Sequence, residues 1–426
     1  MILTPRSVKP FLALTPVLAM MTACQTSPSP APSTSDRSFA QDVAFLSKHR
    51  DTIVLSAPSG KGKVAVVPAF QGRVMTSAAR GDDGQSYGFI KDDLVASDKT
   101  LTGINPYGGE DRFWLGPEGG QFSIFFPPGA KAQTLKEWQT PAVIDTVPYA
   151  VTQKSESSVS FSHTTSLKNF SGNTFDLRID RSIVVLPPAD ALKSLGLSAE
   201  GLDAVAYESR NTITNTGKTA WTKDSGMLSI WILGMYKHSP RTTVTIPLNA
   251  HQGQALAGLV NDSYFGKVPA ERLKVVERAG THDGKPASAL VFKADGQYRS
   301  KIGVAPGAVA GFAGSYDATR NVLTIVSFTF DKAATEYVNS MWEVRQDKPF
   351  SGDVINSYND GASEPGGKPF GPFYEIESSS RAANLAPGQA LSHTHRTIHL
   401  EGPKDKLNAV AVKVLGLSLE QLEHAF

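Results

Sequence analysis

Cysteine is almost absent from this sequence, since Cys24 is the single cysteine among 426 residues. A chain with one thiol forms no internal disulfide and offers no cluster of thiolates to a structural zinc ion. The sequence also contains no glycine-rich nucleotide-binding loop and no His-Glu-x-x-His zinc motif. The fold must therefore rely on its core alone, and we expect neither a metal nor another cofactor.

The first 23 residues predict a lipoprotein signal peptide. Arg6 and Lys9 supply its basic region, residues 10–21 supply its apolar region, and Ala23 is the small residue before the cut. Residues 21–24 (Met-Thr-Ala-Cys) resemble the bacterial lipobox, in which the cysteine thiol receives diacylglycerol. We therefore expect Cys24 to be the lipid-modified first residue of the mature protein.

Residues 24–38 are rich in Ser, Pro, Thr and Ala, a composition that buries no core and forms an extended tether. Gln25 is not the aspartate that, by analogy, retains bacterial lipoproteins at the inner membrane. The sequence thus predicts an exported lipoprotein of the cell envelope, held at the outer rather than the inner membrane.

The sequence has no large excess of positive or negative charge. The 42 basic and 40 acidic residues become equal in number once Arg6 and Lys9 leave with the signal peptide. A balanced chain has no general attraction for a polyanion, so we expect no nucleic-acid partner.

Helical patterns are few, whereas short stretches rich in Val, Ile, Thr, Phe and Tyr recur between turn residues. Such spacing is typical of an all-β sandwich or barrel. The expected helices are residues 39–49, 189–194 and 404–414, with Ser418 and Gln421 forming the capping box of a last short helix. We predict one β domain over residues 39–426, with strands over residues 63–68, 121–126, 159–163, 175–186, 227–233, 242–246, 322–330, 373–377 and 391–400.

Three segments resemble the galactose-mutarotase-like (aldose-1-epimerase-like) superfamily. Residues 206–240 resemble its central strands, residues 108–114 (Gly-Gly-Glu-Asp-Arg-Phe-Trp) resemble the segment of its sugar-binding arginine, and residues 374–388 resemble the strand of its catalytic glutamate with the Pro-Gly turn that follows. The chain as a whole looks most like a family of bacterial lipoproteins within this superfamily. The resemblance implies a supersandwich of antiparallel sheets with a few short peripheral helices, with Arg112 at the sugar-binding position and Glu377, or alternatively Glu375, at the catalytic one.

One departure puts simple anomer interconversion in doubt. The superfamily uses a histidine in the central strand as the acid that protonates the ring oxygen, but the matching residues 229–233 read Ser-Ile-Trp-Ile-Leu. The sequence therefore leaves open whether the cleft is catalytic.

Glu375 and Glu377 share one face of a strand, because residues two apart project to the same side about 6.6 Å apart. Two close carboxylates repel, which raises one pKa and leaves one acid and one base at neutral pH. We take Glu377 as the first candidate for a general base, Glu375 as its partner and Arg112 as the residue that orients the substrate. A solvated, inactive pair is the alternative.

Other polar and aromatic residues are candidates for substrate binding. His393 and His395 share a strand face with His399, and we expect them to line the cleft rather than to bind a metal. Trp114 lies two residues from Arg112 and is the expected sugar platform, although a core role is common for tryptophan. Asp262, Asn356 and Tyr358 belong to polar clusters beside glycines, which also fit simple turns.

We therefore expect an envelope-anchored lipoprotein with a carbohydrate-binding cleft that acts on a sugar or glycan by epimerase-like, hydrolytic or eliminating chemistry. The alternatives are a non-catalytic glycan-binding lipoprotein and a structural envelope protein. The expected partners are a carbohydrate and, through the N-terminal lipid, a membrane. The sequence assigns no oligomeric state.

Overall fold

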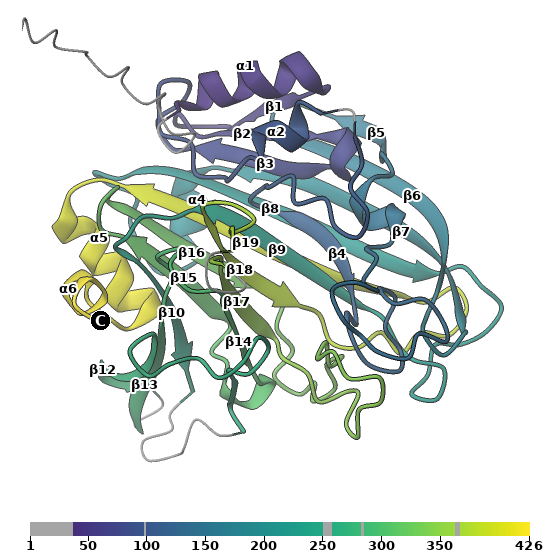
Figure 1. Cartoon of the computed structure of the whole chain (residues 1–426). Helices are drawn as coiled ribbons and strands as arrows, with labels where there is room; N and C mark the ends of the chain where they lie inside the picture. Colours follow the sequence, from purple (N-terminus) through teal and green to yellow (C-terminus); the bar gives the residue numbers. More distant parts are fainter. Residues whose placement is uncertain (1–36, 98, 250–257, 283–284, 363–366) are drawn as a thin grey trace, which may run out of the picture. The chain divides into compact units, whose positions relative to one another are not determined.

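The computed structural model describes residues 37–97, 99–249, 258–282, 285–362 and 367–426. The predicted signal peptide, Cys24 and residues 25–36 of the predicted tether lie outside these residues. Over the described residues, the strands form three sheets whose neighbouring strands are all antiparallel, with a few short helices at their margins (Figure 1). The prediction of an all-β fold of antiparallel sheets is confirmed.

The largest sheet has ten strands, and its long central strands are paired over most of their length. Its strand order is β12 (Leu273–His282), β13 (Lys285–Lys293), β10 (Thr242–Leu248), β15 (Phe312–Asp317), β16 (Val322–Phe328), β19 (Ala390–Glu401), β8 (Asp203–Asn215), β7 (Thr174–Leu186), β6 (Ser158–Lys168) and β5 (Ala150–Lys154).

A six-stranded sheet packs against this one. Its order is β11 (Val260–Asn261), β14 (Ser300–Val304), β17 (Ile355–Asn359), β18 (Phe373–Ser379), β9 (Ser229–Lys237) and β4 (Arg112–Gly116). All nine residues of β9 are buried, as expected for a strand that is covered on both faces. The smaller sheet is thus an internal layer with the ten-stranded sheet on one side.

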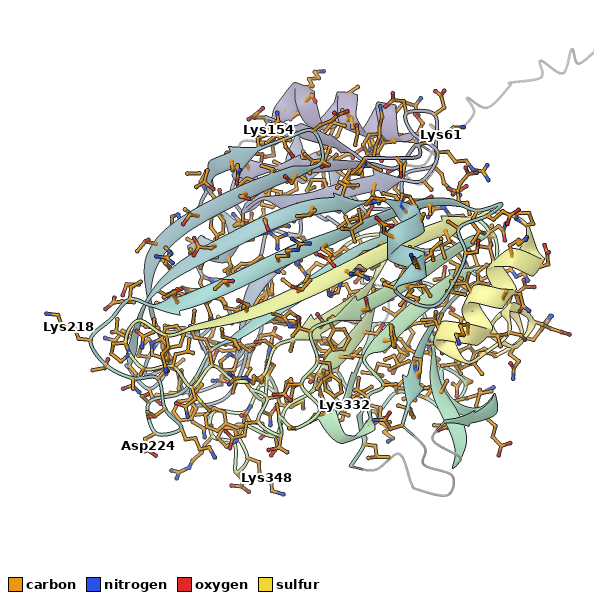
Figure 2. The ribbon with its side chains drawn as sticks, turned by 180° about the vertical axis from the view of Figure 1, so that it is seen from behind. Lys61, Lys154, Lys218, Asp224, Lys332 and Lys348 are labelled. Carbon is orange, nitrogen blue, oxygen red and sulfur yellow. The ribbon has the colours of Figure 1, made fainter. Side chains whose placement is uncertain are left out.

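Alternation along the strands of the large sheet explains the core between the two sheets. In β7, Phe175, Leu177, Ile179, Arg181 and Ile183 are buried, while the residues that alternate with them are exposed or half-buried. This period of two turns one face of the strand to the core and the other to solvent. Figure 2 shows the solvent side, where exposed lysines such as Lys154 extend from the edge of the ribbon.

A third sheet, of order β1 (Ile53–Ser56), β2 (Lys63–Val67) and β3 (Arg73–Ala78), lies near the N-terminal end of the described chain together with α1 (Phe39–His49) (Figure 1). The helix begins at Ser38, whose side chain and that of Gln41 form a capping box. Arg37 forms an ion pair with Asp42. The last two residues of the predicted tether, Arg37 and Ser38, are therefore held by the folded body.

The remaining helices are short: α2 (Asp92–Val95), α3 (Ala142–Asp145), α4 (Pro188–Lys193), α5 (Lys404–Val410) and α6 (Leu419–Glu423). A wider helical turn over Ala411–Leu415 extends α5. Ser418 and Gln421 form the predicted capping box of α6, which packs on β10 and β15 (Figure 1). Among the described residues, no helix has the length and apolar character needed to cross a membrane.

Eight of the nine predicted strand segments coincide with observed strands, with ends that differ by a few residues. The prediction for residues 121–126 is wrong, since this segment forms turns. Its apolar residues pack sideways: Phe125 stacks on Trp138, and Phe126 lies edge-on to Trp342. A run of buried aromatics in a loop has the composition of a strand but lacks a partner strand.

Candidate functional site

One face of the six-stranded sheet forms the floor of a cavity. Antiparallel partners share a face, so the register determines which side chains reach it. Arg112 of β4 is paired with Leu233 of β9, Glu375 of β18 is paired with Met235, and Tyr358 of β17 is paired with Glu375. These five residues all line the cavity.

Arg112 and Glu375 form a buried ion pair at this floor. The distance from Arg112 Nη2 to Glu375 Oε1 is 2.8 Å, and the two side chains are only 4% and 8% exposed. The guanidinium carbon of Arg112 also lies 4.3 Å from the centre of the Trp114 ring, a cation–π contact. Arg112 is therefore held between a carboxyl group and an aromatic face, as an orienting residue should be.

Burial raises the pKa of Glu375 above its usual range, and the nearby Glu377 carboxylate raises it further, against the opposing effect of Arg112. The carboxyl of Glu375 lies within hydrogen-bonding reach of Glu377. Because Glu377 Oε1 is buried without a partner, a proton on Glu375 would satisfy that oxygen. The two glutamates thus form an acid–carboxylate pair in which Glu375 is the group that favours the proton.

Glu377 lies on the same face of β18 as Glu375, but Trp231 and Lys301 contact its side chain and it does not line the cavity. Its side chain is fully buried, and Oε2 accepts hydrogen bonds from Trp231 Nε1 at 2.8 Å and from Lys301 Nζ at 3.1 Å. Burial disfavours the ammonium of Lys301, but the attraction of Glu377, Glu118 and Glu375 outweighs burial and raises the pKa of Lys301. Of the two candidate glutamates, Glu375 faces the cavity, and Glu377 fixes Lys301 and Trp231, which also line it.

Glu118 is a second carboxyl group in the cavity lining, and the sequence analysis did not identify it. Burial raises the pKa of Glu118 to about 7, with Glu377 adding to the rise and Lys301 and Trp342 opposing it. The available sequence signal was its position in the glycine-rich loop that follows β4, where residues 116–120 read Gly-Pro-Glu-Gly-Gly. Loops at strand ends are frequent carriers of functional side chains.

Aromatic rings form the walls. Trp114 is in edge-to-face contact with Trp231, with ring centres 5.5 Å apart, and it also touches Trp138, which in turn touches Trp342. These four tryptophans line the cavity. Aromatic surface beside charged groups is the combination that sugar rings require, because sugars present both apolar C–H faces and hydroxyl edges.

The polar clusters contribute unequally. Tyr358 lines the cavity and donates its hydroxyl to Asp360 at 2.7 Å. Asn356 lies deeper, where its amide donates to the backbone oxygen of Ile302. Asp262 pairs with Lys267 in the loop after β11 at 2.6 Å. Tyr358 alone of the three predicted residues reaches the cavity, and the loop of Asp262 contributes Phe265 instead.

The predicted binding residues His393 and His395 lie on the opposite side of the six-stranded sheet. Both are buried on β19 of the large sheet, where His393 Nε2 and His395 Nδ1 each lie 2.8 Å from Ser378 Oγ. Ser378 alternates with Glu377 along β18, so it projects away from the cavity. Burial lowers the pKa of His393 to about 3 and that of His395 to about 4, which keeps both rings neutral between the sheets.

Residues 84–88 read Gly-Gln-Ser-Tyr-Gly, which has the spacing of a hydrolase nucleophile elbow. Ser86 is fully buried in a segment without regular structure, where its hydroxyl contacts Asp42, Thr76 and Lys237. A nucleophile elbow exposes its serine on a sharp turn between a strand and a helix. Ser86 therefore has the surroundings of a structural residue and not those of a nucleophile.

In the described part of the chain, no three His, Cys, Asp or Glu side chains gather in an arrangement suited to a metal ion. His399, the third histidine of β19, contacts Glu110 at 3.0 Å.

Two packed antiparallel sheets with a charged, aromatic-walled cavity on the smaller one define an all-β sandwich protein. The chain belongs to the family described as "Family of unknown function (DUF6786)", which matches residues 37–426. A comparison with curated proteins finds no match.

Several solved structures are similar to this chain. A putative aldose 1-epimerase from Escherichia coli has 12% identity and a TM-score of 0.46, over 83% of this chain and 100% of the other. A galactose mutarotase-like protein from Lactobacillus casei has 11% identity and a TM-score of 0.43, over 82% and 100%. A putative mutarotase from Salmonella typhimurium has 9% identity and a TM-score of 0.43, over 84% and 92%.

Proposed function

We propose that this protein is an envelope-anchored lipoprotein that binds a carbohydrate in the cavity on the six-stranded sheet and acts on it by proton transfer. The observation that carries the proposal is the pair of carboxyl groups, Glu375 and Glu118, which line one aromatic-walled cavity beside Arg112 and both have raised pKa values. Perturbed carboxyls that converge in a cleft are typical of acid–base sites.

Each group has a distinct role in this proposal. Glu375 is the general acid, because its environment favours the protonated form and Arg112 fixes its position. Glu118 is the second proton-transfer group, since a pKa of about 7 lets it accept or donate a proton near neutral pH. Glu377 is a positioning residue that acts through Lys301 and Trp231.

Substrate binding is assigned to the walls and the floor. Trp114, Trp138, Trp231 and Trp342 offer apolar surface to a sugar ring, and Arg112 and Tyr358 offer polar atoms to its hydroxyl groups. Epimerase-like, hydrolytic and eliminating reactions all need one group that gives a proton and one that takes it.

A second candidate function is that of a non-catalytic glycan-binding lipoprotein. The observation that favours it is the composition of β9, which offers Trp231, Leu233 and Met235 to the cavity where the superfamily's acid would be a histidine. The two candidates share one binding site and differ only in turnover.

The anchor belongs to the same proposal. Residues 1–23 act as the export signal, Cys24 carries the lipid, and residues 24–38 tether the β domain to a membrane, the outer one where the cell has two. Such an arrangement would hold the cavity where envelope or external glycans pass.

The test combines binding with turnover. The purified chain is screened on a glycan array, and positive sugars are followed by calorimetry and by exchange NMR of the sugar signals. Glu375→Gln and Glu118→Gln are compared with the wild type, and Glu156→Gln is the control, because Glu156 is exposed on the turn between β5 and β6.

We expect both cavity variants to bind the sugar and to lose turnover by about 10²-fold or more, with the control unchanged. Sugar binding by all forms without turnover by any would leave the glycan-binding candidate. If the wild type binds no sugar, the proposed function is wrong.

A further inference from the structure

Arg299 is the cavity-lining cation that forms no ion pair with an acid of the described residues. The other two cations of the lining are paired, Arg112 with Glu375 and Lys301 with Glu377. Among the residues that the structure describes, no carboxylate forms an ion pair with Arg299 and no side chain accepts a hydrogen bond from it. Its Nε is buried and has no partner.

Two aromatic rings hold this guanidinium. Its central carbon lies 4.0 Å from the centre of the Phe265 ring and 5.8 Å from that of Phe370. Rings bind a guanidinium through its flat faces and leave the N–H groups at its edge free. Arg299 is thus oriented without the use of its hydrogen-bond donors.

One nearby acid, Asp360, is already engaged elsewhere. Asp360 is close enough for Arg299 to favour its charged form, but its two oxygens accept hydrogen bonds from Tyr358 Oη and from the Gly371 amide, each at 2.7 Å. Asp360 is therefore committed to the floor, and the charge of Arg299 remains available to the cavity.

The charge balance of the cavity points the same way. Three cations, Arg112, Arg299 and Lys301, line the cavity together with the carboxyls Glu118 and Glu375, and two further carboxyls, Glu377 and Asp360, adjoin this lining. Burial raises the pKa of both lining carboxyls, so part of the negative charge is absent near neutral pH. Of the three cations, only Arg299 forms no ion pair with a described carboxylate, so its charge is the one available to attract an anion.

We propose that the ligand of this cavity is a sugar with an anionic substituent, a carboxylate or a phosphate, which Arg299 binds through its free N–H edge. The inference rests on the proposed function, since it specifies the class of sugar that the same site takes. Arginine suits this task because its planar donors match the oxygens of both groups. A neutral sugar would leave the donors of Arg299 without a charged acceptor.

The experiment measures calorimetric affinity of the full chain for matched sugars: D-galacturonate, D-galactose and D-galactose 6-phosphate, with the corresponding D-glucose series. Each is tested with the wild type, Arg299→Gln and Arg299→Lys. Arg178→Gln is the control, because Arg178 is half-exposed and pairs with Asp180 on β7. Circular dichroism checks that every variant is folded.

We expect the wild type to bind an acidic sugar at least tenfold more tightly than its neutral counterpart, with a preference that weakens as salt is added. Arg299→Gln should abolish the preference, and Arg299→Lys should keep part of it, since the charge remains but the planar donors are lost. The relative affinities of the uronate and the phosphate assign the substituent.

Two outcomes would overturn the inference, and they differ in what they say about the proposed function. Equal binding of acidic and neutral sugars, unchanged in Arg299→Gln, would reject the anionic substituent and leave the carbohydrate site intact. If neither class of sugar binds to any form, the proposed function fails and the inference fails with it.

Discussion

Arg112 and Glu375 are joined by a 2.8 Å ion pair although their strands are not neighbours. Strand β9 lies between β4 and β18, so the two side chains meet above the residues of β9 that line the cavity. The pair therefore ties three strands together and closes the floor of the cavity. Loss of either partner should affect both the sheet and the site.

Replacement of Arg112 by glutamine should destabilise the protein by about 1–3 kcal/mol, because the buried carboxyl of Glu375 loses the hydrogen-bond donor that Arg112 supplies. Replacement of both residues, Arg112→Gln with Glu375→Gln, should cost less than the sum of the single changes. Urea unfolding of the two single variants and the double variant measures this coupling. Additive effects would show that the pair contributes no net interaction.

Glu118 should make stability depend on pH. Its pKa is about 7 in the folded protein and about 4.5 when unfolded, so the folded state binds more protons between these values. Stability from this group is therefore highest below pH 4.5 and falls as the pH rises toward 7. Glu118→Gln removes this loss, since glutamine does not titrate.

Melting temperatures of the wild type and Glu118→Gln at pH 4.5 and pH 8.5 measure the effect, because other titrating groups cancel in the difference. We expect the melting temperature of Glu118→Gln, relative to that of the wild type, to be higher at pH 8.5 than at pH 4.5. A difference that is the same at both pH values would mean that burial does not perturb Glu118.

Glu377→Gln should lower the pKa of Glu375, because the substitution removes the negative charge that helps to raise it. Arg112→Gln is the matched variant with the opposite sign, since the guanidinium favours the charged form of Glu375. Carboxyl ¹³C NMR of the two variants and the wild type follows these titrations directly. Shifts in the same direction for both variants would contradict the assigned acid–carboxylate pair.

The layered β architecture could be predicted because the strands of the large sheet alternate clearly. The pattern of β7, in which buried residues such as Leu177 and Ile179 occupy every second position, is a local property of the sequence. The same rule placed Glu375 and Glu377 on one face. It could not tell which of them faces the cavity, because that depends on Trp231 and Lys301, which come from other strands.

The sequence could not place the histidines or Glu118 for a related reason. Period two puts His393 and His395 on one face of β19, but only the packing of β18 against β19 decides that this face meets Ser378 instead of the cavity. The pKa of Glu118 depends on Lys301, Glu377 and Trp342, all more than 180 positions away in the sequence. Local sequence patterns do not predict contacts between residues that are so far apart in the sequence.

Replacement of His393 by alanine should reduce stability and leave carbohydrate binding unchanged. The change removes a contact with Ser378 between the sheets and leaves a buried hydroxyl with one partner fewer, at a cost of about 1–3 kcal/mol. The six-stranded sheet separates this position from the cavity. Thermal unfolding of the variant tests the predicted loss of stability, and calorimetric titration tests the predicted unchanged affinity. A loss of affinity in a folded variant would place His393 in the site.

The same variant should be less sensitive to acid. The folded protein keeps His393 neutral down to about pH 3, whereas an unfolded histidine takes a proton below about pH 6.5. The unfolded state thus binds more protons between these values, so this histidine lowers stability as the pH falls through that window. Melting curves from pH 7 to pH 4 should show a shallower decline for His393→Ala, while an equal decline would show that the ring already carries its proton in the folded state.

Cys24→Ser should release the protein from membranes without altering the cavity, because the lipid and the tether are proposed to serve only as an anchor. The wild type should incorporate a radiolabelled fatty acid and partition into detergent, and the variant should do neither. Arg37 and Ser38 are already bonded into the body, so the lipid and the tether lie before the first residues that the fold requires. We therefore expect the released variant to keep the melting temperature and the sugar affinity of the wild type. A variant that still sediments with membranes would rule out Cys24 as the anchor, and one that loses sugar affinity would show that the N-terminal segment belongs to the site.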